Sequence, residues 1–186
     1  MEPLAFLTPL EEWRQQKDEY LASSRNSPLY GAPAFVGLSY YPEDEAARVV
    51  ARLARASEQR PIMLATSSGE ERLFIEFGTA TFELEGHSAA LTLFAPTDAP
   101  DGPRLFLPFA DATSGRETYG AGRYLDPRLS TSAPDELVLD FNYAYHPYCA
   151  YAEGYVCPFP PAGNRLAVAV RAGERLPAQD LASDAE

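Results

Sequence analysis

The stretch TFELEGHSAALTLF, residues 81–94, carries the pattern that decides the fold. Two short apolar or alternating runs, Thr81–Leu84 and Ala89–Phe94, flank the turn residues Glu85-Gly86-His87. Neighbouring strands of an antiparallel sheet typically have this pattern, in which period-two runs are separated by glycine and polar turn residues. We therefore predict a β-hairpin with His87 as a solvated residue at its tip.

The same alternation of short runs and turns recurs about every ten residues from Phe35 onward, as in an antiparallel meander. Residues 43–56 fit either a helix or a strand, because alanine and arginine favour helix whereas Val49-Val50 fits both periods, and we favour a strand. The fold class predicted is mostly β, an antiparallel meander curled into a barrel or half-barrel. The expected strands are Phe35–Tyr40, Ile62–Ala65, Leu73–Phe77, Thr81–Leu84, Ala89–Phe94, Arg104–Pro108, Glu136–Asn142 and Leu166–Arg171.

A helix is expected before the first strand. Thr8-Pro9-Leu10-Glu11 combines an N-cap residue, a proline at the first helical position and a glutamate three residues after the cap. We predict a helix over about residues 9–22 whose apolar stripe caps a sheet face or a barrel end. Residues 1–173 are expected to form a single β-rich domain, followed by a flexible acidic tail over residues 174–186, which are polar and lack periodicity.

Charge and composition argue against several classes of protein. The 186 residues include 15 basic and 27 acidic side chains, and a net charge of −12 repels nucleic acid. No apolar run approaches the ~20 residues that cross a bilayer, so no membrane partner is expected. Residues 1–13 lack the basic and apolar regions of a secretory signal, and we expect a cytoplasmic protein, in keeping with only two cysteines. The oligomeric state stays open.

A glycine-rich segment, residues 115–126, is the first candidate site. It lacks the Gly-Lys-Ser/Thr ending of a phosphate-binding loop, and Leu125 stands where a dinucleotide fingerprint needs glycine. One interpretation is a tight connection in which glycines adopt positive φ. The other is a site in which Tyr119 and Arg123, beside bare backbone, grip a carboxylate or phosphate.

Aromatic side chains are concentrated in residues 141–159, which contain seven of them. If the strand that begins at Glu136 continues, alternation places Asp140, Asn142 and His146 on the face opposite the aromatic row. Either the aromatic row packs on the core with the polar row solvated, or the polar row lines a concavity such as a barrel mouth.

The two cysteines are close in sequence. Together with His146, Cys149 and Cys157 offer three soft ligands, but they lack the paired C-x-x-C arms of structural zinc sites. A thiol activated by His146 and a local disulfide are further alternatives. We expect no metal and no other cofactor, and we predict two free, buried thiols, because two cysteines make no disulfide framework. The prolines of residues 157–161 predict an extended strap across an edge or opening.

Several motifs spread over nearly the whole chain are specific enough to indicate a family. They are Trp13, Lys17, Ser27-Pro28-Leu29, Leu105-Phe106-Leu107-Pro108-Phe109, Thr118 to Asp126, Asp140-Phe141-Asn142, Tyr145, Pro147, Cys149-Ala150-Tyr151, Cys157-Pro158, Pro160-Pro161, Asn164 and Ala172-Gly173-Glu174. With these motifs the chain resembles a family of bacterial and archaeal proteins known only as a domain of unknown function. The resemblance implies one full-length domain and no established activity. The family usually has asparagine where this chain has His146, which weakens both the metal triad and the cysteine–histidine dyad.

Three classes of function remain open: a small-molecule binding protein, a protein–protein interaction module that uses an aromatic patch, and a hydrolase-like enzyme that uses Asp140 or Cys149. We favour binding of an anionic or aromatic ligand in a pocket at one end of the β structure. Arg123 is expected to pair with the anionic group of the ligand and, in the empty protein, to form an ion pair with a carboxylate such as Asp126 or Asp140. The expected ligand-binding residues are Thr118, Tyr119, Arg123, Asn142, Tyr145 and His146.

Overall fold

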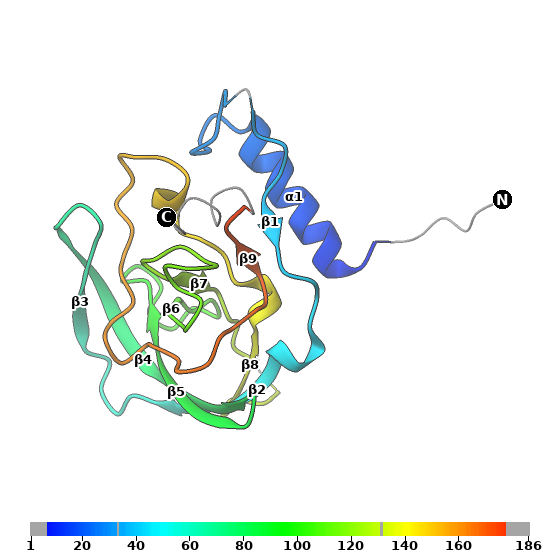
Figure 1. The fold of residues 1–186 in the computed structure, drawn as a ribbon. Helices are drawn as coiled ribbons and strands as arrows, with labels where there is room; N and C mark the ends of the chain where they lie inside the picture. The colour runs from blue at the N-terminus through cyan, green and yellow to red at the C-terminus, as the bar shows by residue number, and fades with distance from the viewer. Residues whose placement is uncertain (1–6, 33, 131, 178–186) are drawn as a thin grey trace.

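The fold is mostly β, with one α-helix near the N-terminus (Figure 1). This computed structural model describes residues 7–32, 34–130 and 132–177. The α-helix is α1 (Pro9–Ser23), and three short 3-10 helices are η1 (Glu45–Ala47), η2 (Phe141–Tyr143) and η3 (Tyr148–Ala150). The strands are β1 (Ser39–Tyr40), β2 (Arg48–Arg55), β3 (Pro61–Ala65), β4 (Glu71–Leu84), β5 (His87–Ala95), β6 (Leu107–Phe109), β7 (Arg123–Leu125), β8 (Glu136–Asp140) and β9 (Glu174–Arg175).

The predicted hairpin of residues 81–94 is confirmed as the centre of the main sheet. β4 and β5 pair in antiparallel register from Leu84 opposite His87. The two expected strands Leu73–Phe77 and Thr81–Leu84 are wrong as separate elements, because β4 runs through both. Gly78, which lies between these two expected strands, sits at a bulge, where a Cβ atom would overlap the Ala54 carbonyl oxygen of β2. The absent side chain therefore lets β2 approach β4.

The strands form three antiparallel sheets. The largest has five strands in the order β3-β4-β2-β8 with β5 on β4, and β1-β9 and β6-β7 are two-stranded. Single bridges continue from Phe94 to Phe106 and from Tyr124 to Tyr145, so the sheet curls around the β6–β7 pair (Figure 1). Within the part of the chain that the structure describes, the ladders do not close into a barrel. One apolar core lies inside this curl and draws on β2, β4, β5, β6 and β8.

Several other strand predictions need correction. The strand favoured for residues 43–56 is confirmed over β2, but its first part is the 3-10 turn η1. Of Phe35–Tyr40 only β1 is a strand, and the Glu136–Asn142 strand ends at Asp140, where η2 begins. Leu166–Arg171 forms no strand. Its backbone is held instead by bonds such as Leu166 N–H to the Ala110 carbonyl.

The predicted helix is confirmed, and its capping box is complete. The Thr8 hydroxyl accepts from the Glu11 N–H, and the Glu11 carboxylate accepts from the Thr8 N–H at 2.7 Å. Leu10 and Leu21 are its buried residues. In Figure 1 the helix lies beside β1, away from the five-stranded sheet, and so covers the β1–β9 end of the molecule. None of the described helices is long and apolar enough to span a membrane.

The C-terminal segment is part of the fold up to the last strand. The sequence placed residue 174 at the start of a flexible tail, but Glu174 is buried and pairs with Tyr40 in the β1–β9 ladder. The error arose because two residues of strand are too few to show periodicity. Residues 178–186 of the expected tail lie outside the described residues.

One buried arginine ties this segment to the sheet. Arg123 on β7 is fully buried, and its Nη2 donates to Asp111 Oδ2 at 2.8 Å and to the Val170 carbonyl at 2.7 Å. Its Nη1 donates to the carbonyls of Ala172 and Glu174 at 2.5 and 3.0 Å. The planar guanidinium thus satisfies one buried carboxylate and three carbonyls that lack strand partners on that side.

Replacing Arg123 with alanine is expected to lower the free energy of unfolding by about 3–5 kcal/mol, because the Asp111 carboxylate would stay buried without its cation. Lysine at this position should give an intermediate loss, since one ammonium cannot reach all four acceptors. Urea unfolding followed by circular dichroism measures both. Arg52→Ala, on the exposed surface of β2, is the matched control and should change stability by no more than about 0.5 kcal/mol. A loss below about 1 kcal/mol for Arg123→Ala would show that the buried pair is not structural.

Candidate functional site

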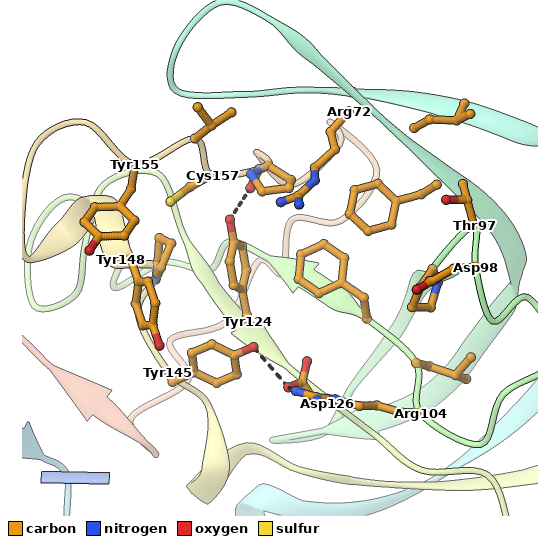
Figure 2. A pocket seen from close by; sticks show the side chains of 18 residues that line it. Arg72, Thr97, Asp98, Arg104, Tyr124, Asp126, Tyr145, Tyr148, Tyr155 and Cys157 are labelled. Carbon is orange, nitrogen blue, oxygen red and sulfur yellow. Dashed lines mark hydrogen bonds and ion pairs between the residues drawn. The ribbon is translucent and has the colours of Figure 1, made fainter. Parts of the chain in front are cut away.

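An open cavity of about 840 Å³ lies between the β3–β4 hairpin and the segment that ends in the proline strap (Figure 2). It is formed by five stretches distant in sequence: residues 72–74, 96–98, 104–106, 124–126 and 145–158. We call it the aromatic groove. Its aromatic and charged lining side chains are Phe74, Phe106, Tyr124, Tyr145, Tyr148, Tyr155, Arg72, Arg104, Asp98 and Asp126.

Aromatic rings cover much of the groove wall. Phe74 and Phe106 are stacked, with centroids 5.1 Å apart and planes at 16°. Tyr124 meets the edge of Phe106 at 4.8 Å, and Tyr145 meets Tyr124 at 5.7 Å. These neighbours form a continuous run of rings, which offers a flat ligand several faces and edges for stacking.

The proline strap is bonded to the opposite wall of the groove. Thr66, at the end of the β3–β4 hairpin, forms a bridge with Pro158. Ser67 donates from its N–H to the Cys157 carbonyl at 3.0 Å and accepts from the Cys157 N–H at 3.1 Å. The Tyr124 hydroxyl donates to the Pro158 carbonyl at 2.5 Å. The expected strap is therefore extended, and it crosses the end of the hairpin.

The charged groups of the groove differ in how they are paired. Arg104 forms an ion pair with Asp126, and the Tyr145 hydroxyl donates to Asp126 Oδ2 at 3.1 Å. Burial and the Asp126 charge raise the pKa of Tyr145, so its hydroxyl stays protonated. Arg72 points into the cavity (Figure 2), and none of the ion pairs within residues 7–32, 34–130 and 132–177 involves it. Arg72 is thus the cation of the groove without a carboxylate partner among the described residues.

The structure scatters the predicted ligand-binding residues. Tyr145 lines the groove, whereas Thr118 is buried and its hydroxyl shares a hydrogen bond with that of Thr113 at 2.9 Å. Asn142 is occupied elsewhere: its Nδ2 donates to the Asp44 carbonyl and to Asp140, at 2.8 and 2.9 Å. Because the strand ends at Asp140, the expected polar row is neither solvated nor part of the groove.

The expected partners of Arg123 are wrong. Asp126 pairs with Arg104, and Asp140 lies 3.7 Å from Arg48, whereas Arg123 pairs with Asp111. A fully buried guanidinium whose two terminal nitrogens donate to four protein acceptors is closed to a ligand from solvent. The glycine-rich segment that contains Arg123 is a tight connection, the first of the two interpretations of residues 115–126. Gly115 and Gly122 in it have positive φ.

Tyr119 and His146 do meet, in a buried cluster next to the groove. His146 Nε2 accepts from the Tyr119 N–H at 3.3 Å, so the neutral ring carries its proton on Nδ1. The backbone N–H of His146 donates to Glu174 Oε2 at 2.8 Å. The same carboxylate accepts hydrogen bonds from the Lys17 ammonium and the Tyr151 hydroxyl. With the Glu174 oxygens so occupied, burial and the charges of Arg123 and Lys17 lower the pKa of His146 to about 3.

Both cysteines are free thiols near the groove. Cys157 is buried and lines the groove, and Cys149 on η3 is half-exposed, contrary to the expectation that both are buried. Burial and a hydrogen bond with the Cys149 side chain raise the pKa of the Cys157 thiol to about 11. Among the described residues, no three His, Cys, Asp or Glu side chains are grouped as metal ligands.

Sequence reasoning missed Arg72, Phe74, Phe106 and Arg104. Phe74 and Phe106 were placed within expected strands, where aromatic residues ordinarily read as core. The pairing of Glu76 on β4 with Phe94 on β5 and the bridge from Phe94 to Phe106 bring the two rings together, and neither is encoded in local spacing. The one available signal was the density of tyrosines in residues 141–159, which did identify one side of the groove.

The neutral state of His146 has a consequence for stability below neutral pH. Between pH 6.5 and about 3 the unfolded chain binds a proton at His146 that the folded chain does not, so the free energy of unfolding should fall as the pH drops through this range. His146→Asn should remove this contribution and lessen the loss between pH 6.5 and pH 5 by about 2 kcal/mol. Urea unfolding at several pH values measures it. His87→Asn, at the exposed hairpin tip, is the control and should keep the wild-type profile. Identical pH profiles for His146→Asn and wild type would show that His146 titrates normally.

The comparisons with known proteins agree on a family and supply no activity. A search of curated proteins finds no match. Among solved structures, the chain is similar to an uncharacterised protein of Haloarcula marismortui, determined by solution NMR, with 37% identity and a TM-score of 0.72. The similarity covers 89% of this chain and 91% of the archaeal protein. Residues 33–175 match the model of a family described as "Protein of unknown function (DUF1684)". The resemblance found in the sequence is thereby confirmed, and the chain belongs to the DUF1684 family.

Proposed function

We propose that this protein binds a small aromatic anion in the aromatic groove. The observation that carries the proposal is Arg72, whose guanidinium points into a cavity walled by stacked rings and pairs with no described carboxylate. The cavity volume of about 840 Å³ falls within the range of about 300–1,000 Å³ that is usual for small-molecule sites.

The ring arrangement suits a flat ligand. Phe74 and Phe106 are already stacked on each other, so an incoming ring would extend an existing stack or meet it edge-on, as Tyr124 does. Because the rings are fixed by packing before binding, little side-chain entropy is lost when a ligand arrives. Shape therefore supports an aromatic or otherwise planar compound.

The charge pattern indicates where an anionic group would sit. Arg104 forms an ion pair with Asp126, and a ligand anion that bound Arg104 instead would leave Asp126 without its cation. Arg72 has no such partner within the described chain, and a guanidinium binds a carboxylate in a planar, bidentate way. The anionic group is therefore assigned to Arg72 and the ring to the Phe74–Phe106 side of the groove.

A second candidate is a protein-binding role, since apolar side chains are exposed at the rim of the groove. Leu73 and Met63, opposite each other on β4 and β3, are 47% and 46% exposed, and Val156 is 42% exposed. Exposed apolar groups around a concave surface are typical of partner sites. A partner would cover these rim residues, whereas a small ligand would contact the rings inside.

A hydrolytic role has less support. Asp140 lies outside the groove and caps η2. It accepts hydrogen bonds from the backbone N–H and the Nδ2 of Asn142, at 3.1 and 2.9 Å. Cys149 lies behind the groove wall beside Cys157. Neither residue reaches into the cavity next to Arg72.

The proposal is tested with two matched probes, 4-hydroxybenzoate and the uncharged 4-hydroxybenzamide, titrated into isotopically labelled protein and followed by NMR chemical shifts. We expect wild type to bind the carboxylate about tenfold more tightly than the amide, because the charge-assisted hydrogen bond to Arg72 is worth about 1.5–3 kcal/mol less some solvent screening. Arg72→Gln should reduce this preference to about one while the amide still binds.

Arg52→Gln, an exposed arginine on a strand outside the groove, is the control and should keep the preference for the carboxylate. Shifts confined to Met63, Leu73 and Val156, or no shifts with either probe at millimolar concentration, would contradict the binding proposal and favour the partner-binding role. An equal preference in wild type and Arg72→Gln would contradict the assignment of Arg72.

A further inference from the structure

Cys149 and Cys157 are held against each other by the surrounding backbone. The Cys149 N–H donates to the Cys157 sulfur at 3.3 Å, so the Cys157 sulfur lies directly beside the backbone of Cys149. We infer that these two residues form a redox-active thiol pair, which a low-molecular-weight disulfide such as oxidised glutathione converts into an intramolecular disulfide. The inference does not depend on ligand binding in the groove.

Each cysteine is fixed by contacts of its own. Cys157 is bonded on both sides of its backbone to Ser67, at 3.0 and 3.1 Å. Cys149 belongs to η3, in which the Tyr151 N–H donates to the Tyr148 carbonyl at 2.9 Å. The Cys157 sulfur is therefore held beside the Cys149 backbone before any reaction, and ring closure costs little further chain entropy because the loop between the two cysteines is short and already formed.

Exposure sets the order in which the thiols react. Cys149 is half-exposed, whereas Cys157 is only 6% exposed and its thiol has a raised pKa. Reagents in solution should therefore meet Cys149 first, and Cys157 should act as the resolving thiol.

The exchange proceeds in two balanced steps. The Cys149 thiolate attacks one sulfur of oxidised glutathione, the glutathione disulfide breaks, and one glutathione thiolate leaves and takes up the proton that Cys149 lost. The Cys157 thiol then gives its proton to solvent and attacks the Cys149 sulfur, which releases the second glutathione thiolate to be protonated. Two protein thiols are oxidised to one disulfide, and one glutathione disulfide is reduced to two thiols.

The experiment treats the reduced, full-length protein with millimolar oxidised glutathione and follows intact mass after acid quenching. Wild type should lose the mass of two hydrogen atoms, and peptide mapping should find Cys149 joined to Cys157. Cys157→Ser should stop at one glutathione adduct on Cys149, which should persist at least about tenfold longer than any adduct on wild type. In Cys149→Ser the remaining thiol should react at least about tenfold more slowly than Cys149 does.

Three results would overturn the inference. The first is wild-type protein that stops at a stable glutathione adduct, as Cys157→Ser does. The second is a bond between chains, seen as a dimer on non-reducing electrophoresis. The third is wild-type protein that keeps two thiols open to iodoacetamide after unfolding. All three are measured on wild type, so the test stands even if a serine variant fails to fold.

Discussion

The structure depends on a buried ion pair that binds backbone as well as charge. Arg123 donates to Asp111 and to the carbonyls of residues 170, 172 and 174, so one guanidinium binds a C-terminal segment whose strand, β9, is only two residues long. Once residue 174 is fixed, its carboxylate receives Lys17 from α1 and the backbone of His146. The helix and the aromatic segment are thereby anchored to the same point.

The sequence predicted the parts of the fold whose backbone hydrogen bonds follow a regular helix or strand. The β4–β5 hairpin and α1 follow from period and capping, and both were predicted. The division of β4 into two expected strands was wrong because Gly78, between them, serves a close contact with Ala54, a residue distant in sequence. The strand expected over Leu166–Arg171 was wrong because part of this backbone, such as the Val170 carbonyl, is bonded to the Arg123 side chain and not to a neighbouring strand, which the local alternation does not reveal.

The candidate site was predictable on one side only. The tyrosines of residues 141–159 stand out by their density, and Tyr145 does line the groove. The opposite wall, with Arg72 and Phe74, lies on a strand whose sequence shows nothing unusual. Arg123 was chosen because glycines surround it, yet its burial shows that a charged residue in a glycine-rich loop can equally be a cross-link of the core.

The bonds between Thr66, Ser67 and the strap at residues 157–158 make the groove a slot whose walls are bonded together at one end. Its two walls are the end of the hairpin and the strap, and they are joined to each other rather than free to part. Widening the slot would require several backbone hydrogen bonds to break together, each worth about 0.5–1.5 kcal/mol. For the ligand binding proposed above, such joined walls would favour a flat ring over a branched or saturated ring of the same mass.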